Sequence, residues 1–223
     1  MVRKSKQEAM KTRRDILSAA ISVFLKKGVA KATVHEIADE ANLTRGAVYW
    51  HFDDKDDLVT AVFEEAINVI IGITEDAVKQ PGATSLTRLK AFLRGPIEQA
   101  IKSEDVRNIY TVLMHFCDHG DEAANAFRLI FRAQGYYEKQ LRHLLNQAID
   151  DGYLRSDLDM ESTIFMLMAS MHGLTLRWLT PGQPIVFDLP ANLNKITDSL
   201  LLGLQHPQSN VTPISVRNIP SQG

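Results

Sequence analysis

The sequence predicts an all-α protein with a small N-terminal three-helix unit and a larger helical domain. Three observations support this fold class. Apolar residues recur at helical spacing along most of the chain, no segment shows the alternation of a strand, and Gly or Pro marks the ends of the helical segments. With 223 residues, of which 45% are hydrophobic, the chain is long enough to bury a sizeable core.

Periodicity and boundary residues place the helices in chain order. A first helix is expected over about residues 8–27, before the C-cap Gly28, and two short helices follow around a turn at Asn42. A long helix then runs from Asp53 or Asp54 to about Val78 and should link the two domains. The next helix is expected around Leu86–Ile97, either kinked or interrupted at Gly95 and Pro96, and an interruption would leave space beside it. The remaining helices are expected over about 104–117, 122–151, 160–179 and 190–205.

The segment from Thr33 to Lys55 reads TVHEIADEANLTRGAVYWHFDDK and predicts a helix-turn-helix. Apolar residues share one face of its first helix, where Thr33 and Glu36 can form a capping box. Thr44 can cap the second helix. The outward residues of that second helix carry hydroxyl, basic or aromatic groups or no side chain at all, which suits the major groove of DNA; they are Thr44, Arg45, Gly46, Tyr49 and His51.

The pattern T-x-x-x-I-A-x-x-A-x-x-T-R-G-A-V-Y-W-H-F-x-x-K, preceded by F-L-K-K-G-V, resembles the DNA-binding domain of the TetR family of transcriptional repressors. The segments VRKSKQEAMKTRRDIL, HFC, RWL and FDL are most similar to the AcrR and TtgR group, which controls multidrug efflux pumps. The strong match covers the first quarter of the chain. One difference lies in the turn, where the family commonly has Gly and this chain has Asn42, a residue that tolerates a left-handed backbone.

The resemblance and the residue chemistry together assign roles in DNA binding. Tyr49 and His51 match contact positions of the family and would bond phosphates or meet base methyls. Arg45 is the candidate for reading a base edge, a guanine in particular, and Lys55 would reach a phosphate from the start of the long helix. Trp50 could either pack the recognition helix onto the first helix or contact DNA. The candidate DNA-binding residues are Thr33, Thr44, Arg45, Gly46, Tyr49, Trp50, His51 and Lys55.

The charge of the chain is unevenly distributed. The formal net charge is −2, but residues 1–52 carry 10 Lys and Arg against 5 Asp and Glu, whereas the remainder carries 15 against 22. The basic end would attract DNA, and Arg3, Lys4 and Lys6 would follow the DNA backbone or minor groove. We therefore divide the chain into a DNA-binding domain (1–52), a ligand-binding and dimerisation domain (53–205) and a disordered tail rich in Pro, Ser and Asn (206–223).

A homodimer is expected because a single recognition helix reads only a few base pairs, whereas two can read a palindromic operator. In the resembled family the last two helices form the dimer interface. Here the segments 160–179 and 190–205 would do so, through Gly173, Thr175, Trp178, Leu193, Ile196, Leu200 and Leu204. The alternative is that these stripes face the core of their own chain. We favour the dimer, since symmetric homodimers are the commonest oligomers.

Adaptable apolar and half-polar side chains gather on the helices of the larger domain. They are Ile67, Ile70, Phe92, Tyr110, Leu113, Met114, Met168, Met171 and His172. Methionine repacks easily, which suits a promiscuous pocket, but such a stripe is also typical of an ordinary core, and the residues alone favour the core. The ligand cavity of the resembled efflux repressors lies between these helices. That resemblance favours a pocket for a small hydrophobic or amphipathic effector.

Neither catalysis nor a cofactor or metal is expected, because the chain has no Gly-rich phosphate loop, metal-spaced motif or nucleophile elbow. His115, Cys117 and His119 could bind a metal or sense oxidation. However, these positions do not all share one helix face, and the neighbouring Asp118 and Asp121 do not favour a reactive thiolate. A single cysteine excludes an intrachain disulfide.

The sequence also indicates where the protein acts. No apolar run reaches membrane-spanning length, and the basic N-terminus leads into an amphipathic helix instead of a signal-peptide core. We therefore expect a cytoplasmic protein whose partners are double-stranded operator DNA, a small effector and a second copy of the chain, with no membrane.

Together these features predict a transcriptional repressor that binds its operator as a homodimer and is released by a small hydrophobic or amphipathic ligand. The resemblance implies control of a multidrug efflux operon. Two alternatives stay open. A regulator of the same family could respond to a fatty-acyl, bile-type or signalling metabolite and could activate instead of repress. A helical interaction module or an enzyme without DNA binding is the rival class, which salt-sensitive, sequence-specific DNA binding would exclude.

Overall fold

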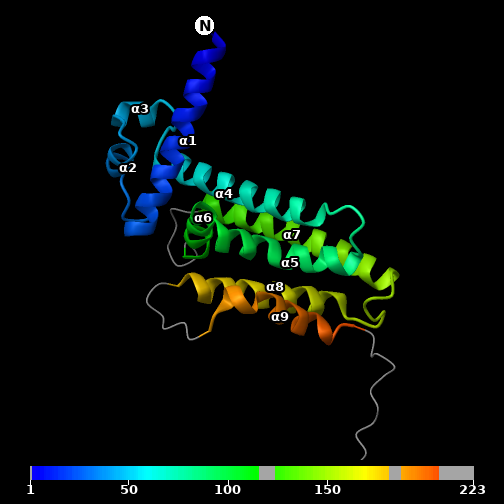
Figure 1. Ribbon diagram of the computed structural model, residues 1–223. Coiled ribbons are helices and arrows are strands. Elements are labelled where there is room, and N and C mark those ends of the chain that lie inside the picture. The colour runs from blue at the N-terminus through cyan, green and yellow to red at the C-terminus, as the bar shows by residue number, and fades with distance from the viewer. Residues whose placement is uncertain (1, 116–123, 181–186, 206–223) are drawn as a thin grey trace, which may run out of the picture.

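The computed structural model describes residues 2–115, 124–180 and 187–205 (Figure 1). Within these ranges the regular structure is helical, which confirms the predicted all-α class; the only bridge described there pairs Leu154 with Gln205. The helices are α1 (Val2–Lys27), α2 (Val34–Glu40), α3 (Arg45–Tyr49), α4 (Lys55–Val78), α5 (Ser85–Lys102), α6 (Glu104–His115), α7 (Ala124–Asp150), α8 (Met160–Leu179) and α9 (Leu189–Leu202).

Helices α2 and α3 form the predicted helix-turn-helix and pack beside α1 at one end of the molecule (Figure 1). The capping box is confirmed: the Glu36 amide donates to Thr33 Oγ1 at 3.3 Å, and the Thr33 amide donates to Glu36 Oε2 at 3.1 Å. Asn42 has a φ of 55°, so it supplies the left-handed residue of the turn. Thr44 caps α3 by accepting a hydrogen bond from the Ala47 amide at 3.2 Å.

The remaining helices lie in two groups. Figure 1 shows α4, α5, α6 and α7 together, with α8 and α9 running as a pair along one side of them. Helix α4 starts after the N-cap Asp54, which accepts a hydrogen bond from the Asp57 amide at 2.8 Å. It packs against α1, α5, α6 and α7. Helix α4 therefore runs from the helix-turn-helix end into the larger part of the fold, and α6 also packs against α1.

Buried apolar side chains form two clusters. The first, here the N-terminal cluster, joins α1–α3 with α4 and α6 and includes the fully buried Ile16, Val48 and Phe63. The second, the C-terminal cluster, joins α5, α7, α8 and α9. Tyr137 and Trp178 pack against both clusters. The border between the clusters is therefore occupied by aromatic side chains.

The predicted start of the first helix and the predicted interruption of the fifth are wrong. Helix α1 begins at Val2 instead of near residue 8, so the backbone that carries the first basic residues is helical. Helix α5 is not interrupted, although Pro96 lacks the amide hydrogen that would bond to the Phe92 carbonyl. Gly95 and Pro96 are both buried, and Gly95 faces Ala77 of α4 so closely that a Cβ there would lie 2.9 Å from the Ala77 Cβ. The predicted space beside this point is nevertheless present, because Pro96 lines an internal cavity.

The predicted dimer stripe of α9 is wrong for the residues that are buried in their own chain, and for its half-buried residues the dimer contact stays a prediction. Leu193 and Leu204 are buried, and Ile196 and Leu200 pack against the C-terminal cluster. Thr175 of α8 is buried as well. The apolar face of α9 covers the core of its own chain, because an isolated subunit must bury its main hydrophobic stripe in order to fold.

We predict opposite effects of the same substitution at two helical glycines. Gly95→Ala should lower the free energy of unfolding by about 1 kcal/mol, because overpacking against Ala77 outweighs the gain in helix propensity. Gly135→Ala, where a Cβ meets nothing within 4 Å, should raise it by about 0.5–1 kcal/mol. Urea unfolding measures both. Equal stabilisation by the two variants would show that α4 and α5 are not in close contact at Gly95.

Candidate functional site

The predicted DNA-binding residues surround α3 on the outside of the molecule. Val48 and Phe52 are buried beneath this helix and fix its position on the N-terminal cluster. His51 and Lys55 are half-buried. The other six predicted residues are exposed: Thr33, Thr44, Arg45, Gly46, Tyr49 and Trp50. The two caps and α3 therefore expose polar and aromatic side chains to solvent.

Trp50 belongs to this exposed surface and does not pack α3 onto α1. Its side chain is 73% exposed, with an edge-on contact to His51 at 4.6 Å between ring centroids. The wedge position is filled by Phe52, which is 3% exposed and lies 5.2 Å beneath the Arg13 guanidinium. The packing alternative for Trp50 is therefore wrong, and its role in DNA contact stays a prediction.

His51 offers a hydrogen bond without a charge. Burial, and then the positive charge of Arg13, lower the pKa of the His51 imidazole below its ordinary value. At neutral pH the ring is therefore predominantly uncharged. If it contacts a phosphate, it does so as a neutral donor.

Lys55 already has a partner within the protein. Its ammonium donates to the Ala30 carbonyl at 3.0 Å and so ties the start of α4 to the segment between α1 and α2. The predicted phosphate contact requires the ammonium to use another of its donors or to exchange this bond.

Sequence reasoning missed a set of ion pairs that hold α2 on α1. Lys26 bonds Glu40 at 2.8 Å, the Ser22 hydroxyl donates to the same carboxylate at 2.7 Å, and Lys27 pairs with Glu36. Hydrogen bonds from these lysines are the main cause of the lowered pKa values of Glu36 and Glu40. The partners lie on different helices, so no spacing rule for a single helix reveals them.

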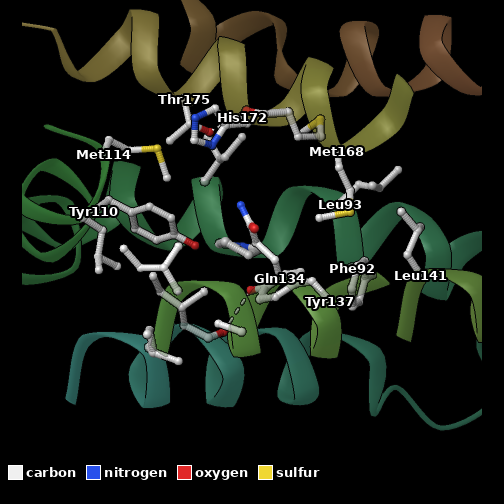
Figure 2. Close-up of a pocket in the computed structure, with 18 residues that line it drawn as sticks. Phe92, Leu93, Tyr110, Met114, Gln134, Tyr137, Leu141, Met168, His172 and Thr175 are labelled. Carbon is white, nitrogen blue, oxygen red and sulfur yellow. Dashed lines mark hydrogen bonds between the residues drawn. The ribbon is translucent and has the colours of Figure 1, made fainter. Parts of the chain in front are cut away.

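A cavity of about 240 Å³ lies inside the larger part of the fold (Figure 2). All nine residues predicted to bind a ligand line it, although they come from α4, α5, α6 and α8. The cavity lies between the two apolar clusters: Ile70 and Leu113 belong to the N-terminal one, and Leu93 and Met171 to the C-terminal one. The geometry thus brings the predicted set together around a space that a small molecule can fill.

Helix α7 contributes a wall that the sequence analysis missed. Its lining residues include Ile130, Gln134, Tyr137 and Leu141. In Figure 2 the Gln134 amide points into the cavity from this helix. The sequence shows an apolar stripe along α7, which is typical of a core face. No local sequence pattern distinguishes the part of that face that lines the cavity.

One hydrogen bond links the cavity wall to the buried side of α4. The Tyr137 hydroxyl lies 2.5 Å from Thr74 Oγ1, and Thr74 is 1% exposed. Burial raises the pKa of Tyr137 to about 12 and holds that of Tyr110 well above its usual range. Both phenols are therefore neutral donors or acceptors at physiological pH.

The remaining sequence hypotheses concern features outside this cavity. Cys117, Asp118 and His119 lie outside the described residues. Within the described ranges, no cluster of three or more His, Cys, Asp or Glu side chains has the arrangement of a metal site. The helices of those ranges are also too short or too polar to cross a membrane.

The helix-turn-helix surface places the protein in the class of DNA-binding regulators. Residues 16–62 match the family described as bacterial regulatory proteins, tetR family, and residues 85–206 match the C-terminal region of MAATS-type transcriptional repressors. The chain therefore belongs to the TetR family of transcriptional repressors, which confirms the resemblance found in the sequence.

Several relatives are similar over nearly their whole length. AcrR of Shigella flexneri is 34% identical over 85% of this chain and 87% of its own, and TtgR of Pseudomonas putida is 30% identical over 89% and 94%. The structure of NalD, described as the secondary repressor of the MexAB-OprM multidrug efflux pump in Pseudomonas aeruginosa, superimposes with a TM-score of 0.74 at 28% identity, covering 88% of this chain and 98% of NalD. These relatives are transcriptional regulators rather than enzymes.

We predict that Trp50→Ala weakens binding to operator DNA about tenfold, which corresponds to about 1.4 kcal/mol. The free energy of unfolding should change by less than about 0.5 kcal/mol, because the side chain is 73% exposed. Phe131→Ala on α7 is the matched control, since Phe131 is 69% exposed and distant from α3 in the sequence. Fluorescence anisotropy and urea unfolding measure the two quantities. Operator binding that is unaffected by Trp50→Ala would remove this residue from the contact surface.

Proposed function

We propose that the protein is a homodimeric repressor that binds a palindromic operator in the cytoplasm, near its own gene and a multidrug efflux operon. A small hydrophobic or amphipathic molecule would release it. The observation that carries this proposal is the apolar cavity of about 240 Å³, which touches α4, the helix that begins at the DNA-reading end. The similarity to NalD, whose description names a multidrug efflux pump, supports the choice of target.

The dimer would use the outward faces of α8 and α9 instead of the stripe first predicted. Large apolar side chains are exposed there: Phe165 is 77% exposed, Met166 39% and Leu202 69%. Large exposed apolar side chains are enriched at protein–protein interfaces, which supports this choice of face. A twofold arrangement would place two recognition helices on one face of the duplex, about 34 Å or a multiple apart.

The ligand would act on DNA binding through α4. Two successive residues of α7 hold two successive residues of α4: Tyr137 bonds Thr74 at 2.5 Å, and Tyr136 donates to Glu75 at 2.7 Å. A ligand that displaces the Tyr137 ring would therefore move α4. The shift would change the separation of the recognition helices, so that both half-sites cannot be engaged together.

The direct test is fluorescence anisotropy of the purified protein on its own upstream DNA, with and without a panel of hydrophobic drugs, dyes, acyl compounds and bile salts. We expect tight, salt-sensitive binding that several unrelated compounds relieve. Relief by an acyl compound or a bile salt alone would favour the metabolite-responsive alternative. Failure to bind any upstream duplex specifically would contradict the repressor function itself.

We predict that Tyr137→Phe uncouples ligand binding from DNA release. The variant loses the bond to Thr74, so the ratio of operator affinities without and with ligand should fall about fivefold or more, whereas ligand affinity measured by calorimetry changes less. Tyr153→Phe is the control, because Tyr153 is 38% exposed and does not line the cavity. An unchanged ratio in Tyr137→Phe would show that the Thr74 bond plays no part in signalling.

A further inference from the structure

We infer that a second cavity of this protein, separate from the apolar one, binds a small organic acid, and that Arg88 pairs with the carboxylate of that ligand. The inference goes beyond the proposed function, because it assigns another site to a ligand of different charge.

The second cavity lies between α4, α5 and α7, which pack against one another in pairs. Its volume is about 150 Å³, and Phe92 lines both this space and the apolar cavity. Polar side chains form most of its wall, in contrast to the apolar cavity. They include Glu75, Arg88, Tyr136, Gln140, His143 and Gln147. A ligand in this space therefore meets a wall that can bind a polar group.

The hydrogen bonding of this wall is incomplete. Nε of Arg88 and Oε1 of Gln147 are buried and have no hydrogen-bond partner among the described residues. The Gln147 amide uses its other end, since Nε2 lies 3.0 Å from His143 Nε2. Buried polar atoms are almost always hydrogen-bonded, so the wall needs partners that the described part of the chain does not supply.

The positive charge of Arg88 is also unpaired within the described residues. None of the ion pairs found there includes Arg88. Glu75, the carboxylate that lines this cavity, is already engaged: it accepts a hydrogen bond from the Tyr136 hydroxyl at 2.7 Å and lies 3.8 Å from the Lys79 ammonium. Because Arg88 is half-buried and its Nε is buried, the guanidinium is held at the cavity wall. An anion is the partner that such a group lacks.

The apolar part of the wall indicates that the anion is organic. Val78, Phe92 and Leu144 line the same cavity. An inorganic ion would leave these side chains without contacts, whereas a small apolar body would fill the space beside them. A carboxylate matches the planar fork of N–H donors on a guanidinium. The ligand class is therefore a small ionised carboxylic acid with an aromatic or aliphatic body.

Four small compounds test this class. Phenylacetate is the organic anion, 2-phenylacetamide is its neutral isostere, 2-phenylethylamine is a cation at neutral pH, and acetate lacks the ring. Binding to the nitrogen-15-labelled full chain is followed by NMR, which observes the Nε–H group of Arg88 directly. Phenylacetate should shift this signal and bind about tenfold more tightly than 2-phenylacetamide or acetate, and at least about a hundredfold more tightly than 2-phenylethylamine.

The variant Arg88→Gln tests the residue. It removes the charge and keeps a polar side chain, so the affinity for phenylacetate should fall about tenfold, while the affinity for 2-phenylacetamide stays unchanged. Arg14→Gln is the matched control, because it removes the same charge from an exposed position of α1, a helix that supplies none of the residues lining this cavity. It should leave both affinities unchanged. If Arg88→Gln does not fold, the four compounds and the Arg88 signal of the unaltered chain still test the site.

Each result decides the inference. Preference for phenylacetate that shifts the Arg88 signal and is lost in Arg88→Gln but kept in Arg14→Gln would establish it. Equal affinity for phenylacetate and 2-phenylacetamide, equal affinity for phenylacetate and acetate, or undiminished binding of phenylacetate by Arg88→Gln would overturn it. Binding of none of the four compounds would also overturn it and would assign the two unpartnered atoms to water. None of these results changes the proposed function, which concerns the apolar cavity and operator DNA.

Discussion

The packing of α4 is the constraint on which the other features of this structure depend. Its first half, including Leu58, Val59 and Phe63, lies in the same buried cluster as α1–α3, and its second half carries Thr74 against α7. At 1.5 Å per residue, its 24 residues span about 36 Å. The helix-turn-helix therefore has no separate core of its own, and its position follows the position of α4.

The cavity lies where two apolar clusters meet and neither fills the space between them. Tyr137 packs against both clusters, so its ring lies at the border between them while its hydroxyl bonds Thr74 of α4. An apolar space of about 240 Å³ would lower stability if nothing occupied it, because the lining atoms would lack contacts on one side. A molecule that fills the space restores those contacts and stabilises the form that binds it. The proposed effector would thus act at the border where the two clusters leave this space.

The charges of the N-terminal end serve structure as well as DNA binding. Lys26 and Lys27 pair with carboxylates of α2, and the Lys55 ammonium bonds a backbone carbonyl. Such exposed pairs contribute about 0–1 kcal/mol each, so their main effect is to orient α2 and α4. The excess of basic residues counted in the N-terminal part of the sequence is therefore larger than the positive charge available to bind phosphates. Arg45 is exposed in the first turn of α3, and its contact with a base stays a prediction.

The sequence by itself determined the features that depend on residues close together in the chain. The caps at Thr33 and Thr44 and the left-handed Asn42 form as predicted, because their bonds and sterics are local. The helical period also placed the nine residues predicted to bind a ligand on helix faces that meet. Only the tertiary structure decided that α5 continues through Pro96, that Leu193 faces its own core, that Trp50 is exposed and that Tyr137 borders the cavity. These outcomes depend on what packs against each helix from elsewhere in the chain, and local periodicity does not specify that neighbour.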